Sequence, residues 1–255
     1  MRRDRVVHGS VLLRRPRLGA LGRSVQNDLG LELIIGGSLV ILAGLAWAWT
    51  VLAAMPDCDG IMPLPSFLMM WTIMMAAMMF PAVIPVVTAF MALTRSRQGR
   101  PVPAAVMFVG GYLVVWGLLG LPAEALLVGA RRLVESAPGL ARAGGVILVA
   151  CGIYQLTPLK DACLRHCRVP HLFLGHHWRD GLGGAFGLGV HHGLYCAGCC
   201  ASIMIVLLVV GVMNITWMIG LSALIYLEKV LPAGTLVGRA AGLALCLTGV
   251  GRLIG

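Results

Sequence analysis

Six apolar stretches of about 20 residues dominate this sequence, and each is long enough to cross the roughly 30 Å hydrocarbon core of a bilayer as a helix. They cover residues 33–53, 67–93, 103–121, 184–212, 215–231 and 235–253. A seventh stretch, 140–159, is less uniformly apolar. Backbone groups in lipid must be hydrogen-bonded within their own segment, so such stretches predict helices. We therefore expect an all-α polytopic transmembrane helix bundle of about seven spans, with six as the alternative.

The positive charge of the chain fits this organisation. The net charge is +10, yet only 12% of the residues are charged and 59% are hydrophobic, far outside the averages of soluble proteins. Of the 20 Lys and Arg residues, 16 fall in alternate segments that include residues 1–32. Cytoplasmic loops collect positive charge. We expect a basic cytoplasmic tail at 1–32, a single transmembrane domain at 33–255, and an exterior C-terminus.

Nucleic acid is not an expected partner of this chain. The basic residues are dispersed and few aromatic residues lie between them, whereas nucleic-acid sites gather both on one surface. The lipid bilayer is the expected environment. Charged residues are nearly absent from the apolar stretches, and we place Glu228 and Lys229 at the inner end of the stretch 215–231. A proton-relay transporter is therefore disfavoured.

The segment HHGLYCAGCC, residues 191–200, combines imidazole and thiol donors inside an apolar stretch. At 100° per residue, four side chains fall within an arc of about 100° on one helix face. They are His192, Cys196, Cys199 and Cys200. This pattern predicts a metal site, the alternative being that the cysteines are small buried hydrophobes. Asn214, further along, is expected to cap or turn the next connection.

A cluster of methionines occupies MMWTIMMAAMMFP, residues 69–81. Met70, Met74 and Met78 share one stripe at i+4 spacing, with Met75 and Met79 beside it. Thioethers and thiolates select Cu(I) over hard ions, although Met also serves as a flexible filler of apolar cores. The methionines and the cysteines of 196–200 both fall near the bilayer midplane. Donors at matched depth would combine if the stretches 67–93 and 184–212 are neighbours.

Cys163 and Cys167 form a further candidate site, at i and i+4 in a cytoplasmic segment rich in histidine. Such a pair can bind Cu(I) with two thiolates, or zinc with added histidines. It can also act as a dithiol redox pair, or belong to a plain basic surface loop. A short amphipathic helix is expected at 122–139, on the outer surface.

Together these segments resemble a known family of bacterial predicted metal-binding integral membrane proteins, long described as a domain of unknown function. The resemblance rests on MMWTIMMAAMMFP, on YQLTPLKDACLRHCRVP, and on HHGLYCAGCC continuing to GVMN and LEKVLP, over about residues 60–240. A named member of this family supplies copper to a tyrosinase-type polyphenol oxidase. The resemblance implies a multi-pass fold in the bacterial cytoplasmic membrane, copper handling, and the methionines and cysteines above with His192 as ligands.

Two classes of function follow from these residues. The favoured class is a non-enzymatic metallochaperone or carrier that delivers copper, as Cu(I) and with zinc as the alternative ion, to a recipient cuproenzyme or a larger membrane complex. The other class is an enzyme. It would be a membrane thiol oxidoreductase that uses Cys163 and Cys167, or a redox metal enzyme that uses Cys196–Cys200.

Overall fold

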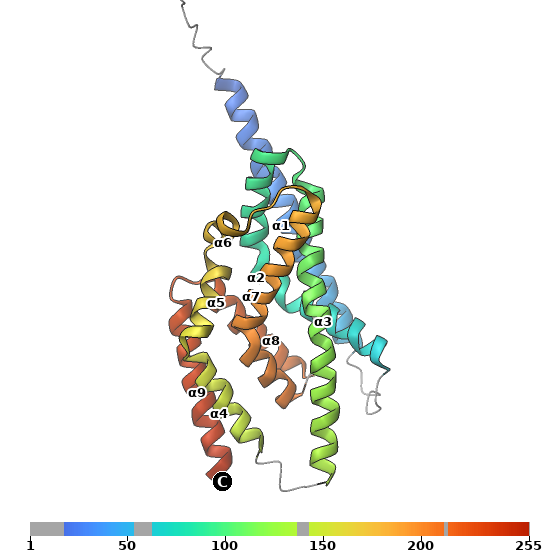
Figure 1. The fold of residues 1–255 in the computed structure, drawn as a ribbon, viewed down its shortest axis with the longest axis vertical. Coiled ribbons are helices and arrows are strands. Elements are labelled where there is room, and N and C mark those ends of the chain that lie inside the picture. Colours follow the sequence, from blue (N-terminus) through green and yellow to red (C-terminus); the bar gives the residue numbers. More distant parts are fainter. Residues whose placement is uncertain (1–17, 54–62, 137–142, 212–213, 255) are drawn as a thin grey trace, which may run out of the picture.

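The computed structural model describes residues 18–53, 63–136, 143–211 and 214–254. All regular structure in these ranges is helical, which confirms the all-α class (Figure 1). The helices are α1 (Leu18–Ala53), α2 (Leu64–Gln98), α3 (Pro101–Ser136), α4 (Ala143–Gln155), α5 (Pro158–Arg168), α6 (Pro170–His177), α7 (Gly181–Val210), α8 (Ile215–Val230) and α9 (Gly234–Ile254). Residues 1–17 of the expected tail lie outside the described ranges, whereas 18–32 continue α1 as helix.

Five of these helices are long and apolar enough to cross a membrane. They lie in α1, α2, α3, α7 and α9, and the bent pair α4–α5 makes a sixth if it counts as one span. The bend, 60°, replaces the straight span expected at 140–159. α8 has only 16 residues and does not qualify. By length and composition, the described helices therefore give five spans, or six with the bent pair.

The outer amphipathic helix expected at 122–139 does not form within the described residues. α3 instead continues through Pro122 to Ser136 as one helix of 36 residues. Sequence reasoning began a separate helix at 122 because this segment carries Glu124, Arg131, Arg132 and Glu135. Pro122 removes one amide donor but does not end α3, because helices in a bundle can satisfy the freed backbone group.

Local sequence explains the connections that position the site. α2 ends at Gly99, whose φ of 68° is left-handed, and Pro101 begins α3. Thr157 caps α5 by accepting a hydrogen bond from the Lys160 amide, which fixes the bend after α4. Asn214 caps α8 through the amide of Trp217, as expected.

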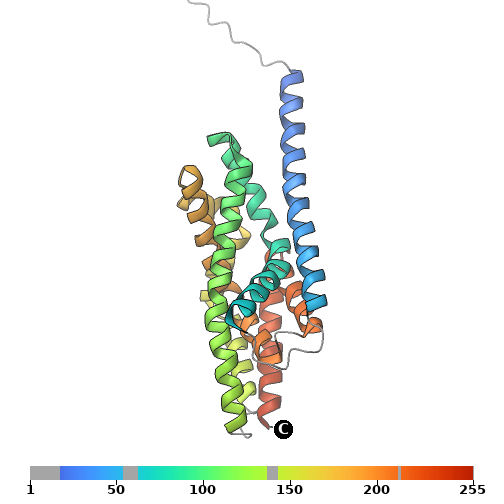
Figure 2. The same cartoon turned by 90° about the vertical axis from the view of Figure 1, so that its right-hand side faces the viewer.

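The helices pack in close pairs where small residues allow it. α3 and α7 run in the same direction, and a Cβ on Gly189 would collide with the Phe108 carbonyl. α4 and α9 run in opposite directions, with the Gly152 and Gly242 backbones in contact. α1 packs along α2, and the beginning of α1 and the C-terminal end of α9 lie at opposite ends of the bundle (Figures 1 and 2).

Candidate metal site

The face of α7 that carries the predicted ligands is turned into the protein. His192 is 2% exposed, and Cys196, Cys199 and Cys200 are 0–1% exposed. α3, α5 and α8 all pack against α7. The four side chains expected on one face are therefore all buried among neighbouring helices.

Cys167 of α5 joins these cysteines, which corrects the prediction of a separate cytoplasmic site. Its sulfur is 3.8 Å from that of Cys199, and the Cys199 and Cys200 sulfurs are 3.6 Å apart. The Cys199 thiol also donates to the Cys196 carbonyl at 3.2 Å, and the Cys196 thiol interacts with the other three. We call Cys167, Cys196, Cys199 and Cys200 the thiol cluster. The bend after α4 explains it, because the bend brings α5 beside the middle of α7.

Cys163 lies at the edge of the thiol cluster, one helical turn before Cys167. It is half-buried, and its sulfur packs against Gly198 so closely that a Cβ there would be 2.9 Å away. Among the described contacts, the thiol partner of Cys167 is Cys199 and not Cys163. The Cys163–Cys167 pair expected from sequence is therefore replaced by a pair between two helices.

Two polar side chains that sequence reasoning missed contact the sulfur of Cys196. The Lys229 ammonium of α8 donates to it at 3.0 Å, and the Tyr112 hydroxyl of α3 lies 3.1 Å from it. Lys229 is only 8% exposed although it lies in the last turn of α8, so its ammonium is buried against α7. An ionisable residue in or beside an apolar stretch often marks a functional site in a membrane protein. Sequence reasoning could have singled out Lys229 on this ground.

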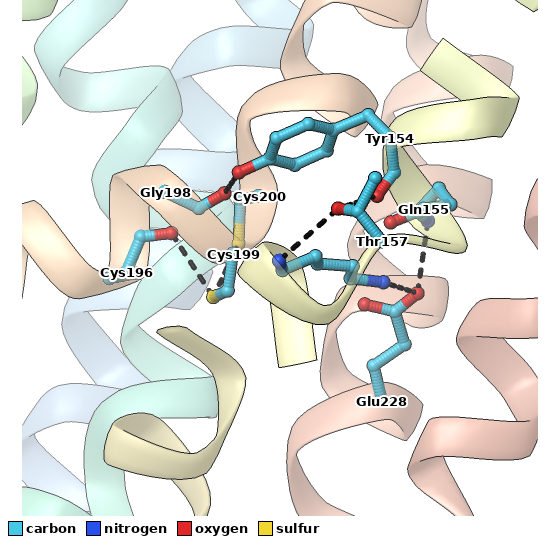
Figure 3. A network of polar contacts seen from close by, with 9 residues as sticks. Tyr154, Gln155, Thr157, Cys196, Gly198, Cys199, Cys200 and Glu228 are labelled. Atoms are coloured by element: carbon cyan, nitrogen blue, oxygen red, sulfur yellow. Dashed lines mark hydrogen bonds and ion pairs between the residues drawn. The ribbon is translucent and has the colours of Figure 1, made fainter. Parts of the chain in front are cut away.

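A buried ion pair stands next to the thiol cluster. The Lys160 ammonium is 2.7 Å from the Glu228 carboxylate, which also accepts from the Gln155 amide at 3.1 Å. Tyr154 links this region to α7 by donating to the Gly198 carbonyl at 2.8 Å (Figure 3). Both charged side chains are at most 2% exposed. These helices therefore enclose a buried ion pair, which the sequence reasoning did not predict.

His192 lies one helical turn before Cys196, inside an aromatic cage. Its ring centroid is 5.8 Å from those of Phe108 and Tyr112 and 5.3 Å from that of Phe173. Its Nδ1 is buried without a hydrogen-bond partner. A buried polar atom left unpaired is unusual and suggests a ligand.

The predicted methionine donors lie in the apolar core of α2. All five are buried, at 0–5% exposure: Met70, Met74, Met75, Met78 and Met79. α2 packs along α3 and α8, whereas α7 packs chiefly along α3. Thr72 contacts Gly117, and Val115 contacts Gly193, so α3 holds the methionines and the start of the cysteine segment at the same height. The two sets of donors therefore lie at matched height in the bundle, although the stretches 67–93 and 184–212 are not close neighbours.

The separations of the sulfurs in the thiol cluster determine how many of them one metal ion could bind. Among the described residues, no group of three or more His, Cys, Asp and Glu side chains is arranged to hold an ion. The sulfurs instead form two close pairs. Two sulfurs bound tetrahedrally to one ion at about 2.3 Å, the Zn–S bond length, lie about 3.8 Å apart. The separations of 3.8 and 3.6 Å therefore suit an ion held by two thiolates.

Comparison with known proteins identifies the family. The family model of PpoB2, described as a copper chaperone, matches residues 68–251. This range contains α3 to α8, the thiol cluster and the methionines, and it agrees with the resemblance found in the sequence. No curated protein and no solved structure matches the chain. Because the match covers well over half of the sequence, the chain belongs to the PpoB2 copper chaperone family.

Proposed function

We propose that this protein is an integral membrane copper chaperone that holds Cu(I) in the thiol cluster and passes it to a cuproenzyme. The family match supports copper and the chaperone role. The observation that carries the proposal is the chain of sulfurs Cys167–Cys199–Cys200, at 3.8 and 3.6 Å, inside a bundle of membrane-length helices. Soft thiolates favour Cu(I) over harder ions.

Lys229 supports the choice of a monovalent ion. Its ammonium is 3.0 Å from the Cys196 sulfur, whereas the charges of Lys160 and Glu228 offset each other. A Cu(I) ion bound by two thiolates of the close pairs carries a net charge of −1, which the Lys229 ammonium balances while Cys196 stays a neutral thiol. A Zn(II) ion bound by two thiolates is neutral, so the ammonium would remain uncompensated in a buried site, which is costly.

Transfer proceeds by exchange of sulfur ligands in this proposal. Cys199 is shared by both close pairs, so an ion held by Cys167 and Cys199 reaches Cys200 by exchanging one sulfur while Cys199 stays bound. The His192 imidazole, one turn away with an unpaired Nδ1, is a further ligand along α7. No oxidant or nucleotide is needed for these steps.

We place the protein in the bacterial cytoplasmic membrane with its N-terminus in the cytoplasm. The distribution of Lys and Arg over alternate segments supports this orientation. The opposite positions of the start of α1 and the end of α9 agree with a C-terminus outside (Figure 1).

Elemental analysis of anaerobically purified protein in detergent tests the proposal. The wild type is expected to keep copper through a wash with the Cu(I) chelator bicinchoninate, and the triple variant Cys196→Ser/Cys199→Ser/Cys200→Ser to lose it in that wash. Cys246→Ser is the matched control, because Cys246 lies on α9 and donates to the Val149 carbonyl, away from the thiol cluster. Copper retained by a folded triple variant after the bicinchoninate wash would overturn the proposal.

The enzymatic alternative has one observation in its favour. Cys167 and Cys199 are close enough to approach each other as a redox pair, which moves the predicted oxidoreductase site from Cys163–Cys167 to these two residues. A metal-free wild type that reoxidises a dithiol substrate, and loses that activity in Cys167→Ser, would favour this function over copper transfer.

A further inference from the structure

A cavity at the end of the bundle opens beside the thiol cluster but uses none of its cysteines. It has a volume of about 160 Å³ and lies where α6 passes into α7. Its lining residues are His177, Trp178, Arg179, Gly187, Leu188 and His191. One water needs only about 10–15 Å³ of such space, so the cavity has room for an ion together with water.

Two imidazoles face each other across this cavity. The ring centroids of His177 and His191 are 5.2 Å apart, and the rings are inclined by 56°. The Nδ1 atom of His177 is 3.2 Å from the Phe173 carbonyl. A carbonyl only accepts, so Nδ1 carries the proton and Nε2 keeps its lone pair. A histidine fixed in this way through its other nitrogen is oriented as metal ligands usually are.

Aromatic rings connect this cavity with the thiol cluster. The Tyr195 ring is 6.1 Å from that of His177, and the His166 ring stacks on Tyr195 at 4.0 Å with the planes nearly parallel. Tyr195 directly precedes Cys196, and His166 directly precedes Cys167. His166 also donates from Nδ1, to the Ala162 carbonyl at 2.9 Å, which leaves its Nε2 as a donor to metal.

We propose that His177 and His191 form a second metal site, an exchange site at which a monovalent copper ion binds before it enters or after it leaves the thiol cluster. This inference rests on the proposed copper function. Imidazole nitrogens suit copper and are harder donors than thiolates, so the ion is held less firmly than by sulfur. Arg179 lines the cavity and Arg97 stacks on Trp178 at 5.3 Å. Their charge repels a monovalent ion half as strongly as a divalent one at the same distance.

The test measures how Cu(I), supplied as its bicinchoninate complex, loads the detergent-purified full chain under anaerobic conditions. The double variant His177→Ala/His191→Ala is expected to slow the loading by about tenfold or more while the final thiol-bound copper is unchanged. His171→Ala is the matched control, because His171 is exposed on the same short helix and does not line the cavity. If the double variant misfolds, the single variant His191→Gln is measured in its place. It is the milder change, because it replaces an exposed imidazole with a polar amide.

X-ray absorption at the copper edge supplies a readout independent of rate. The triple variant Cys196→Ser/Cys199→Ser/Cys200→Ser is expected to retain weakly bound copper with imidazole scattering, which disappears when His177 and His191 are also replaced. Equal loading rates in all histidine variants, without imidazole scattering, would overturn the exchange site alone. A wild type that takes up no copper at all would overturn the proposed function and this inference together.

Discussion

The thiol cluster and the methionine core of α2 contain soft donors at the same height in one bundle, yet their surroundings differ. The five methionines are packed in an apolar core between regular helices. The cysteines lie where one span is bent by 60°, beside a buried ion pair and a buried ammonium. Donor type alone therefore does not mark a metal site. Nearby charge and an interrupted helix distinguish a region built for exchange from a region built for packing.

The largest expected effect comes from breaking the ion pair beside the thiol cluster. Glu228→Gln leaves the Lys160 ammonium buried without its partner at 2.7 Å, so we expect a loss of about 3–5 kcal/mol in the free energy of unfolding. Denaturant titration in mixed micelles measures it. Arg239→Gln is the control, because the pair of Arg239 with Asp161 is exposed and contributes at most about 1 kcal/mol. Equal losses in both variants would show that the buried pair stabilises the fold no more than the exposed pair does.

Removal of the shared sulfur is expected to have the next largest effect. Cys199 contacts both Cys167 and Cys200, whereas Cys200 contacts only one of these two in a close pair. Cys199→Ser should therefore weaken Cu(I) binding by about a hundredfold, and more than Cys200→Ser does. Competition with bicinchoninate measures both affinities. If the two variants bind Cu(I) equally well, transfer through a shared Cys199 is wrong.

A smaller effect is expected from the ammonium beside Cys196. Lys229→Met removes the charge that balances Cu(I) with two thiolates, so the affinity ratio of Cu(I) to Zn(II) should fall by about tenfold. Lys229→Arg keeps the charge and should preserve most of the ratio. Parallel competition titrations with the two ions give the result. An unchanged ratio in Lys229→Met would mean that charge balance does not select the ion.

Sequence reasoning succeeded for features that the spacing of residues along a single helix determines. The apolar stretches predicted the helices, and i+4 spacing placed His192 and the cysteines of α7 on one buried face. The cap at Asn214 was also recognised from its side chain. These features depend on residues within a few turns of one another, which is the range that periodicity describes.

The composition of the site was not predictable in the same way. Cys167 reaches Cys199 because the chain bends between Gln155 and Pro158. The periodicity of apolar residues does not show where the helix after such a bend will lie. The contact of Lys229 with Cys196 joins α8 to α7, and apolar stretches alone do not show which helices lie side by side. Contacts between helices far apart in sequence depend on packing, and the missed charges all lie at such contacts.

The smallest expected effect belongs to the methionines, and it decides between their two interpretations. Met74→Leu and Met75→Leu conserve volume in a fully buried core, so each should change the free energy of unfolding by less than about 1.5 kcal/mol. Leucine has no thioether, so a metal role predicts a loss of copper without a matching loss of stability. Measuring both quantities on the same preparations separates the cases. We expect copper content to stay at the wild-type level, because a side chain packed only among apolar neighbours contributes volume that leucine replaces.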